Sequence, residues 1–126
     1  MKTHIGALGK IEWELMNICW KNGRKTPARV IYEESIKRQM RHYSTVKTML
    51  DRMVRKEYLE KEKFGPLWLY SPKKNRKIVI ASAIDDFIKT VTCNETVPII
   101  KHIIESKKYE TDAETVKSLL KEIAKK

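Results

Sequence analysis

Residues 41–70, RHYSTVKTMLDRMVRKEYLEKEKFGPLWLY, are the most informative segment for the fold because their hydrophobic periodicity changes partway along. In its first half, apolar residues recur every three or four positions, which predicts a helix over residues 45–56 with one buried stripe. The stripe consists of Val46, Met49, Leu50 and Met53. After Glu57 the period changes to two, which predicts two strands joined by a turn at Gly65-Pro66. The stretch therefore predicts a helix that leads directly into a β-hairpin.

The side of this helix opposite the stripe is predicted to be exposed and cationic. Ser44 is expected to cap the helix, and Asp51 lies among the basic residues. The side chains that can contact a polyanion are Ser44, Thr45, Lys47, Thr48, Arg52 and Arg55. Lys and Arg donate to phosphate or to guanine, hydroxyl groups bond base edges or phosphates, and a threonine methyl group can contact thymine. This combination favours contact with nucleic acid over a merely solvated helix face, which is the simpler alternative.

Two further helices are predicted upstream. Residues 9–21 have apolar side chains at helical spacing, and Gly23 stands just past the end, where a left-handed cap is commonly needed. In TPARVIYEESI, Thr26 is expected to cap a short helix and Pro27 to take its first position. The predicted order is helix, short helix, basic helix and hairpin.

This order is that of a winged helix-turn-helix module, in which the recognition helix lies in the major groove of DNA. The predicted fold class is mostly α with a small β-hairpin, made of an N-terminal winged helix-turn-helix and a C-terminal three-helix dimerisation arm. In the wing, Lys61 and Lys63 are expected to touch flanking phosphates. Trp68 and Tyr70 on the return strand are expected to close the core beneath the wing rather than to stack on bases.

Charge is distributed unevenly along the chain. The whole net charge of +11 lies in residues 1–77, which hold 19 Lys/Arg and 8 Asp/Glu, whereas residues 78–126 hold 8 of each. This asymmetry indicates a cationic module that meets a polyanion and a neutral module with another role. The basic connector SPKKNRK is the candidate boundary. We expect a DNA-binding domain over residues 1–74 and a helical dimerisation domain over residues 75–126.

The C-terminal module is predicted to hold three helices with apolar stripes, the last of which opens with a capping box from Thr111 to Glu114. Below about 70 residues a core is marginal, so pairing with a second copy would complete the burial. The residues expected at this dimer interface are Ile84, Phe87, Ile88, Ile100, Ile103, Ile104, Val116, Leu119, Leu120 and Ile123. Two-fold symmetry would present two reading helices about one DNA turn apart, which predicts an inverted-repeat operator. The alternative is that these helices fold back onto the winged module of a monomer.

Three segments carry a resemblance to a known family: EWELMNICW (residues 12–20), PARVIYEE (residues 27–34) and YSTVKTMLDRMVRKEYL (residues 43–59). They resemble the BlaI/MecI family of bacterial repressors, which includes the penicillinase repressors and a copper-responsive branch. The resemblance implies a homodimer, joined through its C-terminal helices, that grips a palindromic operator with its winged helices and blocks transcription. It also implies that the family's DNA-contacting positions at the helix start, and its basic position one turn on, are occupied here by Ser44, Thr45, Lys47, Thr48 and Arg52.

The chain departs from this family's pattern at two points. Penicillinase repressors are cleaved at an Asn-Phe bond in the C-terminal region, whereas the corresponding stretch here is near Lys101-His102 and the sequence has no Asn-Phe pair. The copper-responsive branch carries CxC motifs at its C-terminus, and the final LLKEIAKK of this chain has no cysteine. Neither of these two routes of release from DNA is expected.

Other classes of function find no support in the sequence. No apolar stretch approaches the roughly 20 residues needed to cross a bilayer, and the N-terminus lacks the apolar segment of a signal peptide, so we expect a cytoplasmic protein. His4, His42 and His102 are scattered, and neither a metal nor a cofactor is expected. Cys19 and Cys93 are expected to be buried thiols. With no phosphate-binding loop and no nucleophile motif, the chain is not expected to be an enzyme.

The sequence therefore favours a homodimeric transcriptional repressor that binds double-stranded DNA at a palindromic operator. Two alternatives remain open, a sequence-nonspecific architectural DNA-binding protein and a winged-helix module used only for protein contacts. A specific repressor is expected to prefer one palindrome over random duplex by at least ~10³ at fixed salt. The protein-contact module would bind DNA negligibly even at low salt.

Overall fold

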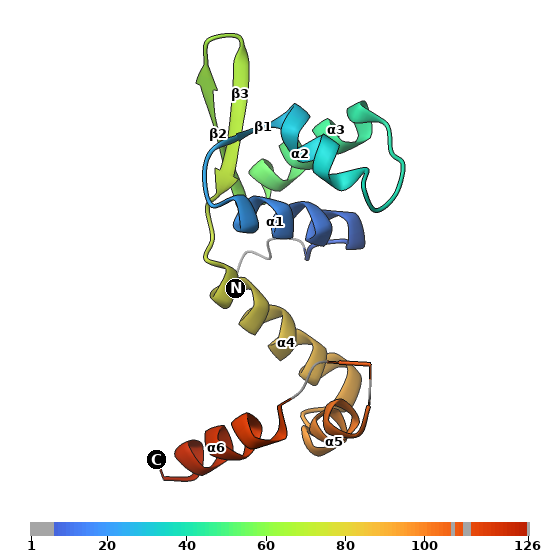
Figure 1. Cartoon of the computed structure of the whole chain (residues 1–126), viewed down its shortest axis with the longest axis vertical. Helices are drawn as coiled ribbons and strands as arrows, with labels where there is room; N and C mark the ends of the chain where they lie inside the picture. Colours follow the sequence, from blue (N-terminus) through green and yellow to red (C-terminus); the bar gives the residue numbers. More distant parts are fainter. Residues whose placement is uncertain (1–6, 107, 110–111, 126) are drawn as a thin grey trace. The chain divides into compact units, whose positions relative to one another are not determined.

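The computed structural model describes residues 7–106, 108–109 and 112–125, which form six helices and one three-stranded antiparallel sheet (Figure 1). In chain order the elements are α1 (Lys10–Asn22), β1 (Thr26–Pro27), α2 (Ala28–Ser35), α3 (Tyr43–Arg55), β2 (Leu59–Phe64), β3 (Leu67–Pro72), α4 (Arg76–Thr92), α5 (Val97–Glu105) and α6 (Ala113–Ala124). The predicted fold class, a winged helix-turn-helix followed by a helical region, is confirmed.

Helix α1 has matched signals at both ends. The Glu12 carboxylate accepts a hydrogen bond from the Gly9 N–H at 2.8 Å, so one amide of the first turn is satisfied by a side chain. At the other end Gly23 has φ +62° and donates its N–H to the Cys19 carbonyl at 3.1 Å. The predicted left-handed cap at Gly23 is confirmed, because this backbone conformation favours a residue without Cβ.

The predicted cap of α2 is wrong. Thr26 and Pro27 pair with Tyr70 and Leu69 as the short strand β1, and the helix begins one residue later, at Ala28. The Thr26 hydroxyl donates to the Arg24 carbonyl at 3.0 Å instead of accepting from the helix. A long-range strand pairing thus takes the residue that the local pattern assigned to the cap.

Helix α3 begins earlier than predicted, and Ser44 is not its cap. The cap residue is His42, whose carbonyl accepts from the Thr45 N–H at 3.1 Å, so Ser44 lies in the first turn with its side chain exposed. At the C-terminal end the chain turns sharply at Glu57, which has φ +68°. The Tyr58 N–H then donates to the Met53 carbonyl at 3.0 Å, and the chain enters β2 at Leu59.

The sheet has the order β1-β3-β2 and forms the wing. In the hairpin Leu59 pairs with Pro72 and Phe64 with Leu67, and Gly65 turns the chain with φ +60°. The strands continue past the helices, so the hairpin projects from the module (Figure 1). The predicted hairpin and its turn are confirmed.

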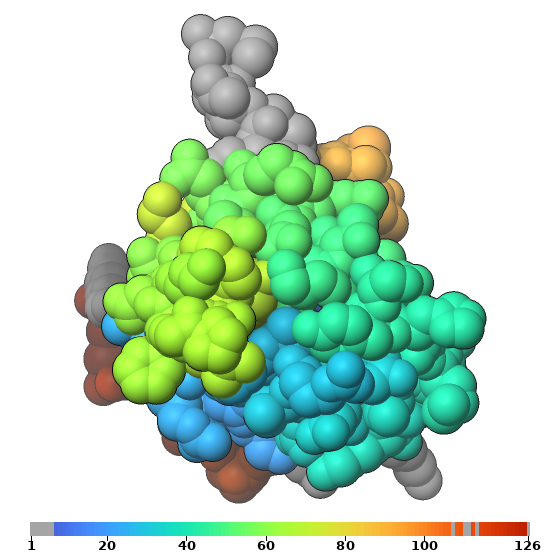
Figure 2. All heavy atoms as spheres, turned by 90° about the horizontal axis from the view of Figure 1, so that it is seen from above, coloured from blue at the N-terminus to red at the C-terminus, as the bar shows by residue number. Residues whose placement is uncertain are grey.

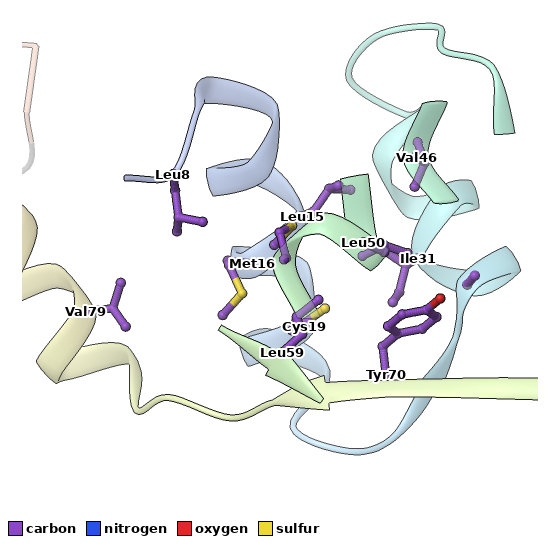
Figure 3. Packing of buried hydrophobic residues seen from close by; sticks show 12 residues of the cluster. Leu8, Leu15, Met16, Cys19, Ile31, Val46, Leu50, Leu59, Tyr70 and Val79 are labelled. Carbon is purple, nitrogen blue, oxygen red and sulfur yellow. The ribbon is translucent and has the colours of Figure 1, made fainter. Parts of the chain in front are cut away.

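One hydrophobic core holds the three helices against the sheet (Figure 3). Its buried members are Leu8, Leu15, Met16, Cys19, Ala28, Ile31, Val46, Leu50, Met53, Leu59, Tyr70 and Val79. The expectation that Tyr70 closes this core is confirmed, but the same expectation for Trp68 is wrong, because its side chain is 39% exposed. Trp68 lies on the same face of β3 as Tyr70, but it is two residues nearer the hairpin tip, where it pairs with Lys63 of the exposed part of β2.

Two ion pairs tie α1 to the segment around α3. The Lys56 ammonium lies 2.9 Å from the Glu12 carboxylate, whose side chain is 5% exposed. The Arg41 guanidinium lies 2.8 Å from the Glu14 carboxylate and also donates to the Ser35 carbonyl at 3.1 Å. Charges this deeply placed need such partners, since an unpaired buried charge is costly. These pairs hold both ends of α3 relative to α1.

The chain divides into two compact units, Met1–Ala81 and Ser82–Lys126. The division falls later than the expected boundary after residue 74, because Val79 in the first turns of α4 packs into the core of the first unit. In the second unit α6 is capped by Asp112, whose carboxylate accepts from the Glu114 N–H at 3.0 Å. The predicted cap residue, Thr111, lies outside the described residues.

The two cysteines lie in different environments. Cys19 is buried, as predicted, and burial raises the pKa of its thiol to about 12, so it is protonated at neutral pH. The prediction for Cys93 is wrong: it is exposed and follows the end of α4 with φ +52°.

Candidate nucleic-acid interface

The outward side of α3 carries the polar residues that the sequence singled out. The amphipathic pattern places Val46, Leu50 and Met53 in the core, so residues on the opposite side face solvent. The exposed members of this side are Ser44, Thr45, Thr48, Arg52 and Arg55. They form a row along the helix with hydroxyl groups at its N-terminal end and guanidinium groups at its C-terminal end. We call this row the α3 face.

The wing lies next to this helix on one side of the first unit. Figure 2 shows the yellow-green atoms of the hairpin beside the green and teal atoms of the α3 region. Lys61 and Lys63 are exposed, and their ammonium groups lie 4.8 and 5.7 Å from the centre of the Trp68 ring. The half-exposed indole therefore supports both cations through cation–π contact while leaving them accessible.

Lys47 differs from the rest of the predicted contact residues because it is ion-paired within the chain. Its ammonium lies 2.8 Å from Oδ2 of Asp51, one helical turn away, and the two side chains are 31% and 26% exposed. Spacing of i and i+4 puts such a pair on one side of the helix. The hydrogen bond to Asp51 is the main cause that raises the pKa of Lys47 above its usual range. The lysine therefore stays charged, with donors left for a further partner.

Asp51 joins the recognition helix to both strands of the wing. Its Oδ1 accepts from the Tyr70 hydroxyl at 2.6 Å and from the Lys61 ammonium at 3.2 Å. Burial works to raise the pKa of this carboxyl, but the hydrogen bonds from Lys47, Tyr70 and Lys61 outweigh it and lower the pKa to about 2. The stability that these bonds contribute is present above the ordinary carboxyl pKa of about 3.9 and is lost as the pH falls through the lowered value.

Tyr70 completes this group from inside the core. Burial, followed by its hydrogen bond to Asp51, raises the pKa of its phenol to about 12, so the hydroxyl remains a donor at every physiological pH. Its ring belongs to the buried core, so the position of the hydroxyl is fixed, and its hydrogen bond fixes the position of the Asp51 carboxylate.

Two functional features were missed by reasoning from sequence. Asp51 was placed on the exposed side of the helix, and only its i, i+4 spacing from Lys47 signalled a pair. Arg29 of α2 lies with its guanidinium 4.3 Å from the centre of the Tyr43 ring and 5.6 Å from that of Tyr32, next to the start of α3. The Tyr32 ring belongs to the same helix, but the closer Tyr43 ring belongs to α3, and a local pattern does not reveal that contact.

Among residues 7–106, 108–109 and 112–125, no group of three or more His, Cys, Asp or Glu side chains is placed to hold a metal ion. None of the helices within those residues combines the length and the apolar character that crossing a membrane requires.

Comparison with known proteins decides the family. The family model described as "Penicillinase repressor" matches residues 8–126, which is nearly the whole chain. The chain belongs to the penicillinase repressor family. The predicted resemblance is thereby confirmed, and the protein is a DNA-binding repressor rather than an enzyme.

One solved structure is similar to this penicillinase repressor family member. The DNA-binding domain of the repressor BlaI, determined in solution, matches with a TM-score of 0.53 and 25% sequence identity, over 60% of this chain and 90% of that chain. A search of curated proteins found no match.

Proposed function

We propose that this penicillinase repressor family member is a cytoplasmic homodimer that binds a palindromic operator and reads its bases with the start of α3. The observation that carries the proposal is the α3 face, where hydroxyl and cationic side chains are exposed beside a cationic wing. A row of hydrogen-bonding groups of this kind fits the donors and acceptors of a major groove.

Each predicted contact residue has a role in the proposal. Side chains near the start of the helix meet base edges: Ser44, Thr45, Lys47 and Thr48. Cations farther along the helix and in the wing meet phosphates: Arg52, Arg55, Lys61 and Lys63. The phosphate contacts position the module and make affinity depend on salt, while the base contacts give preference for one sequence.

The second unit supports the homodimer. Eight of the ten residues of the predicted interface are exposed on a single chain, with exposed fractions from 42% for Ile100 and Ile103 to 63% for Ile123. The other residues of the predicted interface with half or nearly half of their surface exposed are Ile84, Phe87, Ile104, Leu119 and Leu120. Ile88 and Val116 are partly buried. So much exposed apolar surface in about 45 residues calls for a partner, and a second copy is the partner that every cell making this chain contains.

An open hollow of about 570 Å³ adds to this argument. It lies within the second unit, and its lining includes Phe87, Pro98, Ile99, Ile103 and Tyr109. A hollow of this apolar character accepts large side chains, which is how interfaces between obligate partners are built. In the proposed homodimer, apolar side chains of the second copy fill it.

The proposal is tested by selection from a pool of randomised duplexes, followed by competition binding at one salt concentration. The selected sequence is expected to be an inverted repeat that outcompetes its scrambled version by about 10³ or more. An architectural protein would yield no selected sequence, and a protein-contact module would bind no duplex. Either result overturns the proposal.

Two matched variants separate base reading from phosphate contact. Thr48→Ala is expected to weaken binding to the selected duplex and to leave the scrambled duplex unaffected. Lys63→Gln is expected to weaken both alike and to reduce the dependence of log K on log salt by about 1. If Thr48→Ala weakens both duplexes equally, Thr48 does not read bases.

A further inference from the structure

A negative charge at Asp51 is electrostatically unfavourable for DNA binding. It is the single acidic residue of α3, and it lies next to the α3 face in the part of the chain that holds the entire +11 charge excess. A carboxylate there repels the phosphates of a bound duplex and lowers affinity for every sequence. Its presence therefore needs a function that outweighs this loss.

The contacts of Asp51 point to that function. Its two oxygens bind three donors from three different elements: Lys47 of α3, Lys61 of β2 and Tyr70 of β3. Lys61 and Tyr70 are also paired across the hairpin, so one carboxylate joins the helix to both strands of the wing. Because the Tyr70 ring is buried in the core, its hydroxyl holds the Asp51 carboxylate in a fixed position. The carboxylate in turn fixes the positions of the Lys47 and Lys61 ammonium groups.

Both lysines are held further by aromatic rings. The Lys61 ammonium lies 4.8 Å from the centre of the Trp68 ring, and the Lys47 ammonium lies 5.7 Å from that of Tyr70. A free lysine side chain has four rotatable bonds and loses much rotamer entropy when it is ordered in a complex. Here the ordering is achieved before DNA binds, which lowers the entropic loss on binding.

We propose that Asp51 is a positioning residue that fixes the Lys47 and Lys61 ammonium groups relative to each other and thereby determines sequence specificity. The inference rests on the proposed function, because it assigns Asp51 a role at the same DNA-binding face. Lysines held in one geometry match one arrangement of guanine and phosphate oxygens, whereas free lysines follow any phosphate. Asp51 thus lowers the affinity for DNA of any sequence but increases the preference for one sequence over others.

The test compares Asp51→Asn with Glu62→Gln on the selected and the scrambled duplex. Glu62 is a matched control because it also lies in the wing, and Glu62→Gln removes one negative charge, as Asp51→Asn does. The Glu62 carboxylate pairs with Lys25 at 2.6 Å and not with Asp51, Lys47, Lys61 or Tyr70. Asp51→Asn is expected to reduce the preference for the selected duplex about tenfold. Its affinity for the scrambled duplex is expected to stay the same or to rise. Glu62→Gln is expected to strengthen both complexes alike and to leave the preference unchanged.

A second pair of variants identifies the partner of Asp51. In a Lys61→Met background, Asp51→Asn is expected to reduce the preference by a smaller factor than in the wild type, because residues that act together give non-additive effects. If the two substitutions act independently, Asp51 does not work through Lys61 and the inference is overturned. Tyr70→Phe removes a single hydroxyl donor from the group and is expected to lower the preference in the same direction by less.

Each remaining outcome decides between the two proposals. A wild type without preference for any sequence overturns the proposed function itself. A wild type with preference and an Asp51→Asn protein that retains it overturns only the positioning role, as does an equal gain for both duplexes, which shows that Asp51 merely repels DNA. If circular dichroism shows that Asp51→Asn does not fold, the Tyr70→Phe preference decides, and an unchanged value overturns the inference.

Discussion

At the scale of single residues, the backbone is strained just after the C-terminal end of the recognition helix α3, at Glu57. Glu57 ends α3 with φ +68°, a conformation in which a side chain with Cβ is crowded by its own backbone. Its carboxylate does bind Lys73 at 2.7 Å, but the two side chains are 56% and 49% exposed, so this pair contributes little. The sharp turn is needed because Leu59 must enter the core two residues later.

Glu57→Gly is therefore expected to stabilise the protein. Glycine adopts this backbone conformation without steric conflict, and the melting temperature is expected to rise by about 4 °C. Glu57→Ala is the control, since it removes the ion pair but keeps the Cβ atom, and it is expected to give no increase. Thermal unfolding followed by circular dichroism measures both. An increase for Glu57→Ala as large as that for Glu57→Gly would show that the gain does not come from the backbone.

At the scale of elements, the orientation of α3 depends on charged groups as well as on the core. Its apolar stripe sets which side is buried, but a stripe alone permits sliding along the helix axis. The Arg41–Glu14 pair before the helix and the Lys56–Glu12 pair after it attach both ends to α1. Asp51 then attaches the middle of the helix to the wing. The reading surface is thereby held on two sides.

Lys56→Met is expected to test this attachment. The Glu12 carboxylate is 5% exposed, and removing Lys56 leaves it with the Gly9 N–H as its remaining described partner. Breaking a buried pair in this way costs about 3 kcal/mol of unfolding free energy, measured by urea denaturation. The matched control is Lys73→Met, which breaks an exposed pair and is expected to leave the unfolding free energy nearly unchanged. Equal effects of the two substitutions would contradict a special role for the Glu12 pair.

At the scale of the whole molecule, the two units differ in how they bury apolar surface. The first unit has a core with fully buried members from helices and strands, whereas Val79 is the one buried residue of α4 and the described residues of α5 contain none. The first unit is complete as a single chain. The second keeps its apolar side chains exposed, which is the basis of the proposed homodimer.

Leu120→Asp is expected to shift the proposed homodimer toward monomer. Leu120 is 50% exposed on α6, so a charge there disturbs little within one chain but is buried without a partner in the dimer. Ser118→Asp adds the same charge to an exposed position of the same helix and serves as the control. Sedimentation equilibrium is expected to show at least a tenfold weaker dimer for Leu120→Asp, which corresponds to about 1.4 kcal/mol. A wild-type protein that sediments as a monomer would overturn the homodimer.

Periodicity and turn residues were enough to predict the winged helix-turn-helix and the side of α3 that faces solvent, because both are local properties of the chain. Gly23, the Val46–Met53 stripe and the Gly65 turn were all predictable in this way. The folded chain was needed to show which residues cap α2 and α3, that Trp68 is exposed, and that Asp51 binds two lysines and a tyrosine. The α2 cap, the exposure of Trp68 and the Asp51 bonds depend on which distant residues the fold brings close together, and the spacing of neighbours in the sequence contains no information on that.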